Sequence, residues 1–231
     1  CGMDIDGFLR SAEPPVSRSS LRIPWGATVI GHVGRFMPQK NHEFLLRAAA
    51  EAIRENPRLH LLLVGDGPLR GEMEALASSL GIEGNVSFTG NRLDVPSLMR
   101  HAMDCFFLPS LWEGLGIVAL EAQALGLPCL LSDAVPMEAN RLPHRNRVFP
   151  LSASPRDAAR ALLSLADSTT LSRVGLPDPH QFLYSINDNA DALEQAYGRA
   201  LSGRARRGPF TLPEGDLPTQ LPECEEVTPW K

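Results

Sequence analysis

The chain has 231 residues, of which 43% are hydrophobic, and a formal net charge of −5. This length fits one large domain with appendages, and the apolar content can supply a full core. The weak negative charge gives no reason to expect nucleic acid or an acidic membrane as the main partner, and no apolar run reaches the roughly 18 residues of a membrane span.

The first 25 residues carry no clear hydrophobic periodicity and are rich in Ser, Pro and Arg. We interpret residues 1–25 as a leader or linker that precedes the folded domain. Because the chain starts with Cys1 and not with Met, we expect it to be a fragment or a processed piece.

Four cysteines occur, and none belongs to a CxxC pair. Two of them, Cys105 and Cys129, fall in predicted core strands, and the other two are Cys1 and Cys224. We therefore expect small buried hydrophobic side chains, which fits a reducing compartment.

The first predicted strand, residues 28–36, ends in Gly34 and Arg35. A loop that contains Lys40 follows, and a helix begins after Asn41, the expected cap. Two cations and the free N–H groups of a helix N-terminus then surround one point, where charge-assisted hydrogen bonds would hold a diphosphate. The alternative is a solvated basic turn.

Residues 59–64 form a continuous apolar run, typical of a parallel strand covered on both faces. The turn Gly65-Asp66-Gly67-Pro68 leads into a helix that Gly81 closes. Gly65, Gly67 and Gly71 imitate a dinucleotide fingerprint, but the third glycine is one residue late and no acidic residue follows where ribose binding would need one. The pattern therefore disfavours a nucleotide-dependent oxidoreductase.

A short strand is predicted at 86–89, and a loop with Arg92 follows it. A buried strand at 105–108, a loop with two glycines, a helix over 117–125 and a strand at 128–131 indicate a βαβ unit. Its glycine loop precedes a helix N-terminus, which favours an anion site.

Two carboxylates distinguish this unit from an ordinary glycine-rich turn. Glu113 lies in the loop, and Glu121 lies inside an otherwise apolar helix. An ionised carboxylate costs several kcal/mol, on the order of Born-type penalties, to desolvate, so Glu121 requires a basic side chain or a ligand hydroxyl as partner.

The signal weakens beyond Asp133. We expect a last strand at 148–151, a helix that starts at the Ser154 to Asp157 capping box, and another helix over 187–201. The predicted folded domain covers residues 26–202, and the Pro-rich and acidic stretch 203–231 is typical of a disordered tail. Strands that alternate with helices give a doubly wound, Rossmann-like α/β sheet, which binds ligands at the carboxyl ends of its strands.

The string from Glu113 to Glu121, Glu-Gly-Leu-Gly-Ile-Val-Ala-Leu-Glu, resembles the donor-site signature of retaining glycosyltransferases with the GT-B fold. The Gly34-Arg35-Phe36 string with Lys40 resembles the diphosphate clamp of the same family, group 1 or family four. Residues 2–6 are similar to the segment that enters its C-terminal domain. The resemblance implies that this chain is the C-terminal, donor-binding half.

The resemblance also implies roles for individual residues. Arg35 and Lys40 would neutralise the donor's diphosphate, Glu121 would accept hydrogen bonds from ribose, and Glu113 would accept one from the donor sugar. Arg92 would approach the base. The remaining expected contacts come from the backbone around the glycine loop: Gly34, Gly114, Leu115, Gly116, Ile117 and Val118.

We expect no cofactor and no metal site, because the chain has no HExxH or clustered His pattern. Its six histidines are scattered: His32 is interpreted as packing, and His42 and His101 as polar surface. The donor would be a nucleotide sugar, with UDP usual in similar enzymes.

The family implies polysaccharide or glycolipid synthesis in the cytoplasm, with association at the inner face of the membrane left open. A saccharide or lipid-linked acceptor would bind through a preceding domain that this chain lacks, so the chain alone is expected to be inactive or weakly active. The alternative is a non-catalytic module that senses a nucleotide sugar. The intact spacing of Glu113 and Glu121 argues against it.

Overall fold

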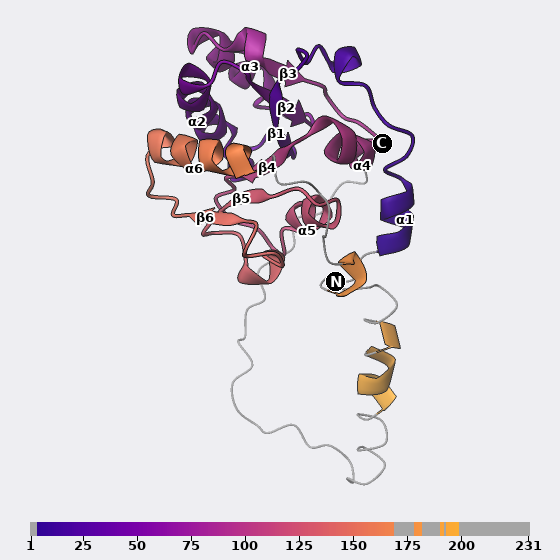
Figure 1. Cartoon of the computed structure of the whole chain (residues 1–231). Coiled ribbons are helices and arrows are strands. Elements are labelled where there is room, and N and C mark those ends of the chain that lie inside the picture. The colour runs from indigo at the N-terminus through magenta and orange to yellow at the C-terminus, as the bar shows by residue number, and fades with distance from the viewer. Residues whose placement is uncertain (1–3, 169–177, 182–189, 192, 199–231) are drawn as a thin grey trace. The chain divides into compact units, whose positions relative to one another are not determined.

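The computed structural model describes residues 4–168, 178–181, 190–191 and 193–198 (Figure 1). The chain divides into two compact units, Cys1–Asn189 and Ala190–Lys231. In the second unit, residues 190–191 and 193–198 are helical, as the helix predicted over 187–201 requires. The expected tail, residues 203–231, and two of the cysteines, Cys1 and Cys224, lie outside the described residues.

The first unit is built on a parallel sheet in the order β3-β2-β1-β4-β5-β6 (Figure 1). The chain order reverses between β1 and β4, where Ile30 pairs with Cys105, so the sheet is doubly wound as predicted. The strands in the described part of the chain are β1 Thr28–Val33, β2 Leu59–Val64, β3 Val86–Phe88, β4 Cys105–Leu108, β5 Cys129–Ser132 and β6 Arg147–Phe149.

Helices cover both faces of the sheet. On one face lie α2 His42–Glu55, α3 Arg70–Ser79 and α6 Pro155–Ser168 (Figure 1). The other face carries α1 Ile5–Arg10, α4 Val95–Ser97, the π-helical turn η4 Leu98–Ala102 and α5 Ile117–Ala124. Short 3-10 turns complete the described elements: η1 Arg18–Leu21, η2 Pro38–Lys40, η3 Glu83–Asn85, η5 Met137–Ala139 and η6 Pro179–Gln181.

Side chains alternate across the strands and so feed two separate cores. Val29 and Phe106 belong to the cluster under α4 and α5, whereas Ile30 and Phe107 belong to the cluster under α2 and α6. All six residues of β2 are buried, because helices cover it on both faces.

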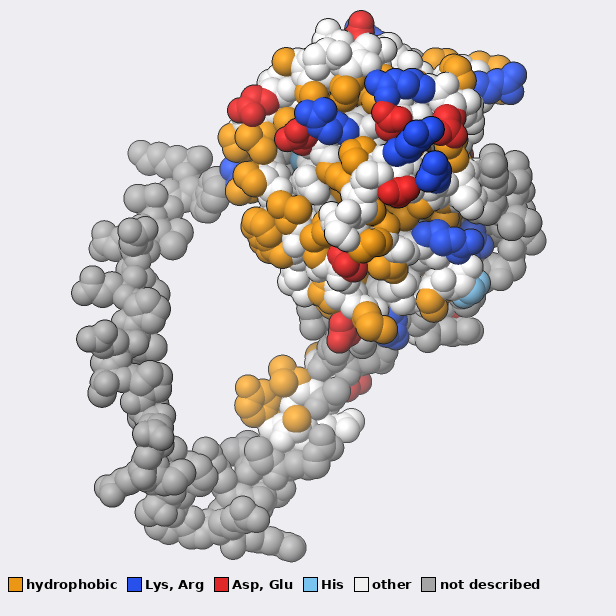
Figure 2. Space-filling model, turned by 90° about the vertical axis from the view of Figure 1, so that its left-hand side faces the viewer, with side chains coloured by type: hydrophobic (Ala, Val, Ile, Leu, Met, Phe, Trp, Pro, Cys, Tyr) orange, Lys and Arg blue, Asp and Glu red, His pale blue; other side chains and the backbone are white. Residues whose placement is uncertain are grey.

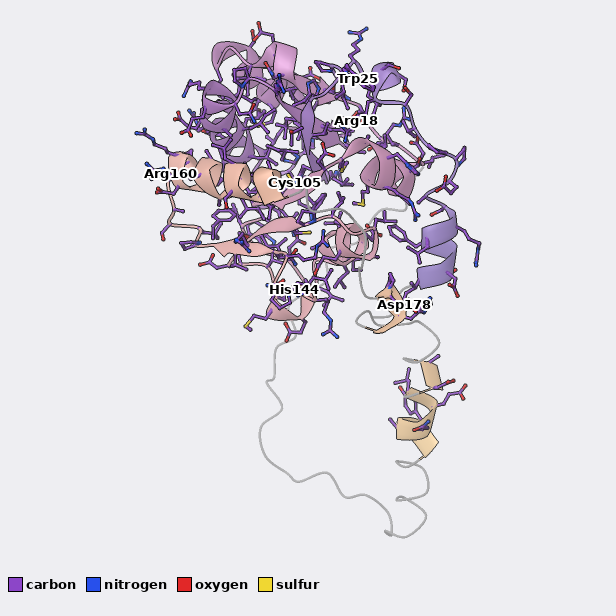
Figure 3. The ribbon with its side chains drawn as sticks, viewed as in Figure 1. Arg18, Trp25, Cys105, His144, Arg160 and Asp178 are labelled. Carbon is purple, nitrogen blue, oxygen red and sulfur yellow. The ribbon has the colours of Figure 1, made fainter. Side chains whose placement is uncertain are left out.

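The two described cysteines follow the same alternation. Cys105 and Cys129 are fully buried free thiols in the two different cores, so they lie on opposite faces of the sheet. Cys105 is labelled near the middle of the domain in Figure 3, and burial raises the pKa of its thiol to about 12. The prediction of small buried hydrophobic side chains is confirmed for both.

The N-terminal segment, residues 4–27, has regular structure and contributes to the core, although its sequence shows no clear periodicity. It contains α1 and η1 and buries Ile5 and Leu21 in the core under α4 and α5. Arg18, labelled in Figure 3, forms an ion pair of 2.7 Å with Asp104. The apolar residues of this segment contact a distant element and are irregularly spaced, so no hydrophobic periodicity predicted their burial. The interpretation of residues 1–25 as a leader or linker from a preceding domain stays a prediction.

Two predicted helix caps fare differently. The side chain of Asn41 makes no cap to α2 and donates to the carbonyl oxygen of Pro109 at 3.2 Å, so that prediction is wrong. Asn41 has a φ of 54°, which turns its side chain towards the end of β4 instead. At α6 the backbone N–H of Asp157 donates to Ser154 Oγ at 3.2 Å, as a capping box requires.

On the face drawn in Figure 2, Lys and Arg side chains are intermingled with Asp and Glu. This arrangement fits the modest net charge of −5. No helix in the described ranges is long and apolar enough to cross a membrane.

Candidate functional site at the carboxyl ends of the strands

Three loops meet where β1, β2 and β4 end. The loop after β1 is held on one side by the turn after β2, through a hydrogen bond of 3.0 Å from Phe36 N to Asp66 O. On its other side, Leu111 N, in the loop after β4, donates a hydrogen bond of 2.8 Å to Gln39 O. The carboxyl ends of these strands therefore form one continuous surface, which is where a doubly wound sheet binds ligands.

Close packing explains the glycines of the turn after β2. Gly65 has a φ of +135°, and a Cβ there would lie 2.1 Å from the carbonyl oxygen of Gly34. A Cβ on Gly67 would lie 2.6 Å from the carbonyl oxygen of Phe36. Backbone meets backbone at this point, so only glycine fits. The first two glycines of the string that imitates a dinucleotide fingerprint, Gly65 and Gly67, thus serve the packing of two loops.

The centre of the surface is an ion pair between residues far apart in the sequence. Lys40 Nζ lies 2.7 Å from Glu113 Oε1, and their side chains are only 17% and 8% exposed. Ser110 Oγ donates to the same oxygen at 2.6 Å. The sequence placed Lys40 and Glu113 on different parts of a ligand, and the structure brings the two into direct contact. Ser110 was not singled out, because serine after a strand is common in turns.

Gly34 and Arg35 precede this pair on the same loop. A Cβ on Gly34 would lie 3.2 Å from Cγ and Cδ of Lys40, so the lysine stem lies across the glycine. Arg35 is exposed, and no ion pair or hydrogen bond of its side chain is recorded in the described part of the chain. Its side chain is therefore accessible to a ligand on the loop that also carries Lys40.

The loop after β4 continues into α5. Gly116, the N-cap residue of α5, has a φ of +71° and carries no side chain that could cap the helix. The first N–H groups of the helix, at Ile117 and Val118, have no intrahelical acceptor. Gly114 and Ile117 are exposed, while Leu115 and Val118 are half-buried. The predicted backbone donors from Gly114 to Val118 thus lie together at the N-terminus of α5.

Glu121 lies one turn further along α5 and is half-buried. No hydrogen bond or ion pair from the described residues reaches its carboxylate, and burial raises its pKa. The predicted protein partner of this carboxylate is therefore absent from the part of the chain that the structure describes. A ligand hydroxyl is the remaining option that the sequence offered.

Arg92 stands apart from these residues. Its guanidinium binds Asp94 through two hydrogen bonds, of 2.8 and 2.6 Å, and this pairing lowers the pKa of Asp94. It lines a cavity of about 650 Å³ beside β3, which Thr89 and His60 also line. No contact among the described residues joins Arg92 to Lys40, Glu113 or Glu121, and its approach to a base stays a prediction.

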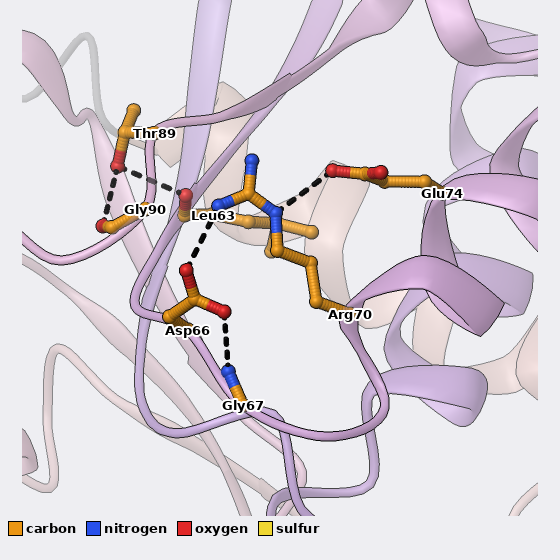
Figure 4. Close-up of polar contacts among 7 residues, drawn as sticks. All are labelled: Leu63, Asp66, Gly67, Arg70, Glu74, Thr89 and Gly90. Carbon is orange, nitrogen blue, oxygen red and sulfur yellow. Dashed lines mark hydrogen bonds and ion pairs between the residues drawn. The ribbon is translucent and has the colours of Figure 1, made fainter.

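A second polar network, which the sequence did not reveal as a unit, joins the ends of β2 and β3 (Figure 4). Arg70 binds Asp66 at 3.2 Å and Glu74 at 2.8 Å. Thr89 Oγ1 lies 3.2 Å from the carbonyl oxygen of Leu63. The i,i+4 spacing of Asp66, Arg70 and Glu74 was the available signal, since such spacing places side chains together on a helix.

Two histidines form a buried aromatic cluster behind the site. His42 was expected at the surface but is 2% exposed, so that expectation is wrong. It stacks on Phe36, with ring centroids 4.0 Å apart, and meets His32 edge-on at 4.7 Å. Burial lowers the pKa of His32 to about 4 and that of His42 to about 2, so both are neutral near pH 7.

The other two histidine expectations are simpler. His32 is fully buried, and its Nδ1 lies 2.8 Å from the carbonyl oxygen of Phe107, which agrees with a packing role. Because a carbonyl only accepts, Nδ1 carries the proton. His101, expected at the surface, is half-buried and lies 3.1 Å from the carbonyl oxygen of Ala12. Within the described ranges, no three His, Cys, Asp or Glu side chains are grouped to hold a metal ion.

This chain is similar in sequence and fold to known proteins. The putative glycosyltransferase EpsF of Bacillus subtilis is 42% identical over 135 residues, which cover 58% of this chain and 35% of the relative. The UDP-Gal:alpha-D-GlcNAc-diphosphoundecaprenol alpha-1,3-galactosyltransferase of Escherichia coli is 33% identical over 140 residues, with coverage of 57% and 35%. The chain thus spans about a third of the length of these relatives.

The fold is also that of Anabaena HepE, solved in complex with UDP and glucose. The TM-score is 0.67 at 24% identity, over 85% of this chain and 55% of HepE. This similarity confirms the predicted Rossmann-like, GT-B-type fold. Residues 15–173, more than half of the chain, match one protein family. The chain belongs to that family, the glycosyl transferases group 1.

Proposed function

We propose that this chain binds a nucleotide-sugar donor, linked through UDP, and supplies the donor half of a retaining glycosyltransferase. The observation that carries the proposal is the ion pair of Lys40 with Glu113 at the end of β1 and β4. It lies on the loops that converge with the uncapped end of α5 and with exposed Arg35. Cations, free N–H groups and carboxylates in one place suit a ligand that combines a diphosphate with sugar hydroxyls.

In this proposal the diphosphate binds the two cationic side chains, Lys40 and Arg35. Lys40 exchanges the Glu113 carboxylate for phosphate oxygens, and Arg35 approaches from the solvent side. Backbone N–H groups between Gly114 and Val118 donate to the phosphates, since a helix N-terminus favours an anion. As the bond from the sugar to the diphosphate breaks, negative charge grows on the leaving oxygen, and these donors stabilise it. The chemistry then requires no metal ion.

The two carboxylates take hydroxyl groups. Glu121, which lacks a partner among the described residues, accepts from the ribose, and the bond offsets the cost of its burial. Glu113 accepts from a hydroxyl of the donor sugar once Lys40 turns to the phosphate. The name of the related Escherichia coli enzyme specifies a UDP-linked sugar, and HepE was solved with UDP. Both support UDP as the nucleotide.

The acceptor, a saccharide or a lipid-linked sugar, binds to a further domain. We assign the enzyme to polysaccharide or glycolipid synthesis in the cytoplasm, with the inner face of the membrane as its working surface. The Escherichia coli relative is named for a diphosphoundecaprenol-linked substrate, which supports a lipid-linked acceptor. Without the further domain the chain binds donor but transfers little or no sugar.

Calorimetric titration with UDP tests the donor site. We expect wild type to bind, and Lys40→Ala and Glu121→Ala each to lose about 10-fold or more in affinity, because each variant removes a hydrogen bond to a charged group. The matched controls are Arg47→Ala and Glu51→Ala, which remove a cation and a carboxylate from exposed ion pairs on α2. Equal losses in the controls, or no UDP binding by folded wild type, would refute the proposed donor site.

A further inference from the structure

Two buried serines stand behind Glu113 and are not explained by donor binding alone. Ser110 follows β4 and is 0% exposed, and Ser132 ends β5 and is 1% exposed. Hydroxyl groups are costly to bury unless they are hydrogen-bonded, so the partners of these two define what they do.

The hydrogen bonds run in one direction. Ser132 Oγ donates to the carbonyl oxygen of Ser110 at 2.6 Å. Ser110 Oγ has a single proton, and it goes to Glu113 Oε1 at 2.6 Å, because a carboxylate only accepts. The end of β5 therefore fixes the backbone of Ser110, and the side chain of Ser110 fixes the carboxylate of Glu113.

Both internal donors of Glu113 use the same oxygen. Lys40 Nζ lies 2.7 Å from Oε1 and Ser110 Oγ lies 2.6 Å from it. No described residue donates to Oε2. Two short bonds to one oxygen set the rotation of the carboxylate about its last torsion, which is otherwise broad. Oε2 is thus the oxygen held ready for a ligand.

We infer that Ser110, braced by Ser132, is a positioning residue that keeps Glu113 Oε2 directed at a hydroxyl of the donor sugar. The inference rests on the proposed donor site, in which Lys40 leaves Glu113 for the diphosphate. Ser110 is then the one described side chain that still holds the carboxylate. The rigid ends of β4 and β5 carry this support, so the carboxylate keeps its place while its ion-pair partner changes.

The test compares UDP with UDP-galactose and UDP-glucose by calorimetry on the full chain. Ser110→Ala is expected to leave UDP affinity within about 2-fold and to remove about 10-fold from the affinity for the UDP-sugar that wild type prefers. Ser110→Thr, which keeps the hydroxyl, restores most of that loss. Ser132→Ala has a smaller effect in the same direction. Ser79→Ala is the control, since Ser79 is an exposed serine on α3.

A serine that merely stabilises the loops gives a different result. Ser110→Ala would then weaken UDP and UDP-sugar equally, or weaken neither, and Ser110→Thr would rescue nothing selectively. Either outcome overturns the inference while the donor site stands.

A second measurement needs no ligand. In a double-mutant cycle followed by urea unfolding, Ser110→Ala and Glu113→Ala are expected to be non-additive, because each variant removes the one hydrogen bond that the two side chains share. Additive effects would overturn the role of Ser110. A folded wild type that fails to bind UDP refutes the donor site, and the cycle still decides whether Ser110 holds Glu113.

Discussion

Two polar clusters lie at the same edge of the sheet and are built in different ways. In the first, Lys40 and Glu113 pair across 73 residues of sequence, with side chains 17% and 8% exposed. In the second, Arg70 pairs with Asp66 and Glu74, each four residues away, with side chains 29% and 46% exposed. Exposed local pairs contribute roughly 0–1 kcal/mol and are common on any surface. A shielded pair between distant loops costs free energy of desolvation, and such pairs are therefore candidates for functional sites.

The largest expected effect comes from the point where the turn after β2 meets the loop after β1. Gly65→Ala would place a Cβ 2.1 Å from Gly34 O, at a φ of +135°. Because backbone must move on both sides, we expect a loss of about 3 kcal/mol or more in the free energy of unfolding, measured in urea. Gly71→Ala is the control, since a Cβ there meets nothing within 4 Å. A loss below about 1 kcal/mol at Gly65 would contradict the close contact.

Breaking the shielded pair comes next. Removal of one partner of a buried ion pair costs roughly 3–5 kcal/mol, and residual solvent exposure reduces this, so Lys40→Ala should cost about 2 kcal/mol. The same urea unfolding measures it. Lys40→Ala combined with Glu113→Gln should recover part of the loss, because the lone carboxylate is then gone. A cost as small as that of an exposed pair would remove the distinction between the clusters.

The histidine pair behind the first cluster makes it sensitive to acid. His32 and His42 have folded-state pKa values of about 4 and about 2, below the ordinary 6.5. Below pH 6.5 the unfolded chain therefore binds more protons than the folded one, so stability is complete above pH 6.5 and falls as the pH drops. Each histidine contributes a slope that rises to about 1.4 kcal/mol per pH unit once the pH is well below 6.5.

Unfolding between about pH 6.5 and pH 5 lies above the range of most carboxylates. Burial also lowers the pKa of His60 to about 4, so His60 contributes in the same window, and only the difference between variant and wild type isolates the share of His42. His42→Phe keeps an aromatic ring on Phe36 and should flatten the slope by about 1 kcal/mol per pH unit on average over this window. His144→Asn, at an exposed histidine labelled in Figure 3, should leave it unchanged. Equal slopes in wild type and His42→Phe would show that His42 is not held neutral.

The smallest effect belongs to the exposed pair after β3. Arg92→Ala removes the two hydrogen bonds to Asp94, whose side chains are 35% and 37% exposed. Exposed pairs contribute little, so we expect a change within about 0.5 kcal/mol in urea unfolding. If Arg92→Ala nevertheless weakens UDP binding in calorimetry, the residue contacts the nucleotide, and the donor site extends from the first cluster to the loop after β3.

The sequence predicted the sheet well where burial is complete. The bounds of β2, residues 59–64, and β4, residues 105–108, agree with the predicted runs, because helices on both faces require continuous apolar stretches. The N-terminal segment was missed, since Ile5 and Leu21 contact a distant part of the core at no fixed period. Local patterns carry no record of such contacts.

The site was predictable by residue type but not by contact. Strand ends and glycine loops identified Lys40, Glu113 and Glu121 as candidates, because parallel strands bring their carboxyl ends together. The direct bond between Lys40 and Glu113, and the serine behind them, depend on loop conformations that no periodicity encodes. The burial of His42 depends likewise on where Phe36 lies.

The two strands at the margins of the sheet, β3 and β6, are three residues long, whereas β1 and β2 at its interior have six. A marginal strand exposes unpaired N–H and C=O groups, and its length sets how many a second chain can engage. Three residues offer a poor template for another strand. The sheet therefore ends on both sides in a way that discourages copies of the protein from joining edge to edge, even at the high concentrations used to titrate weak ligands.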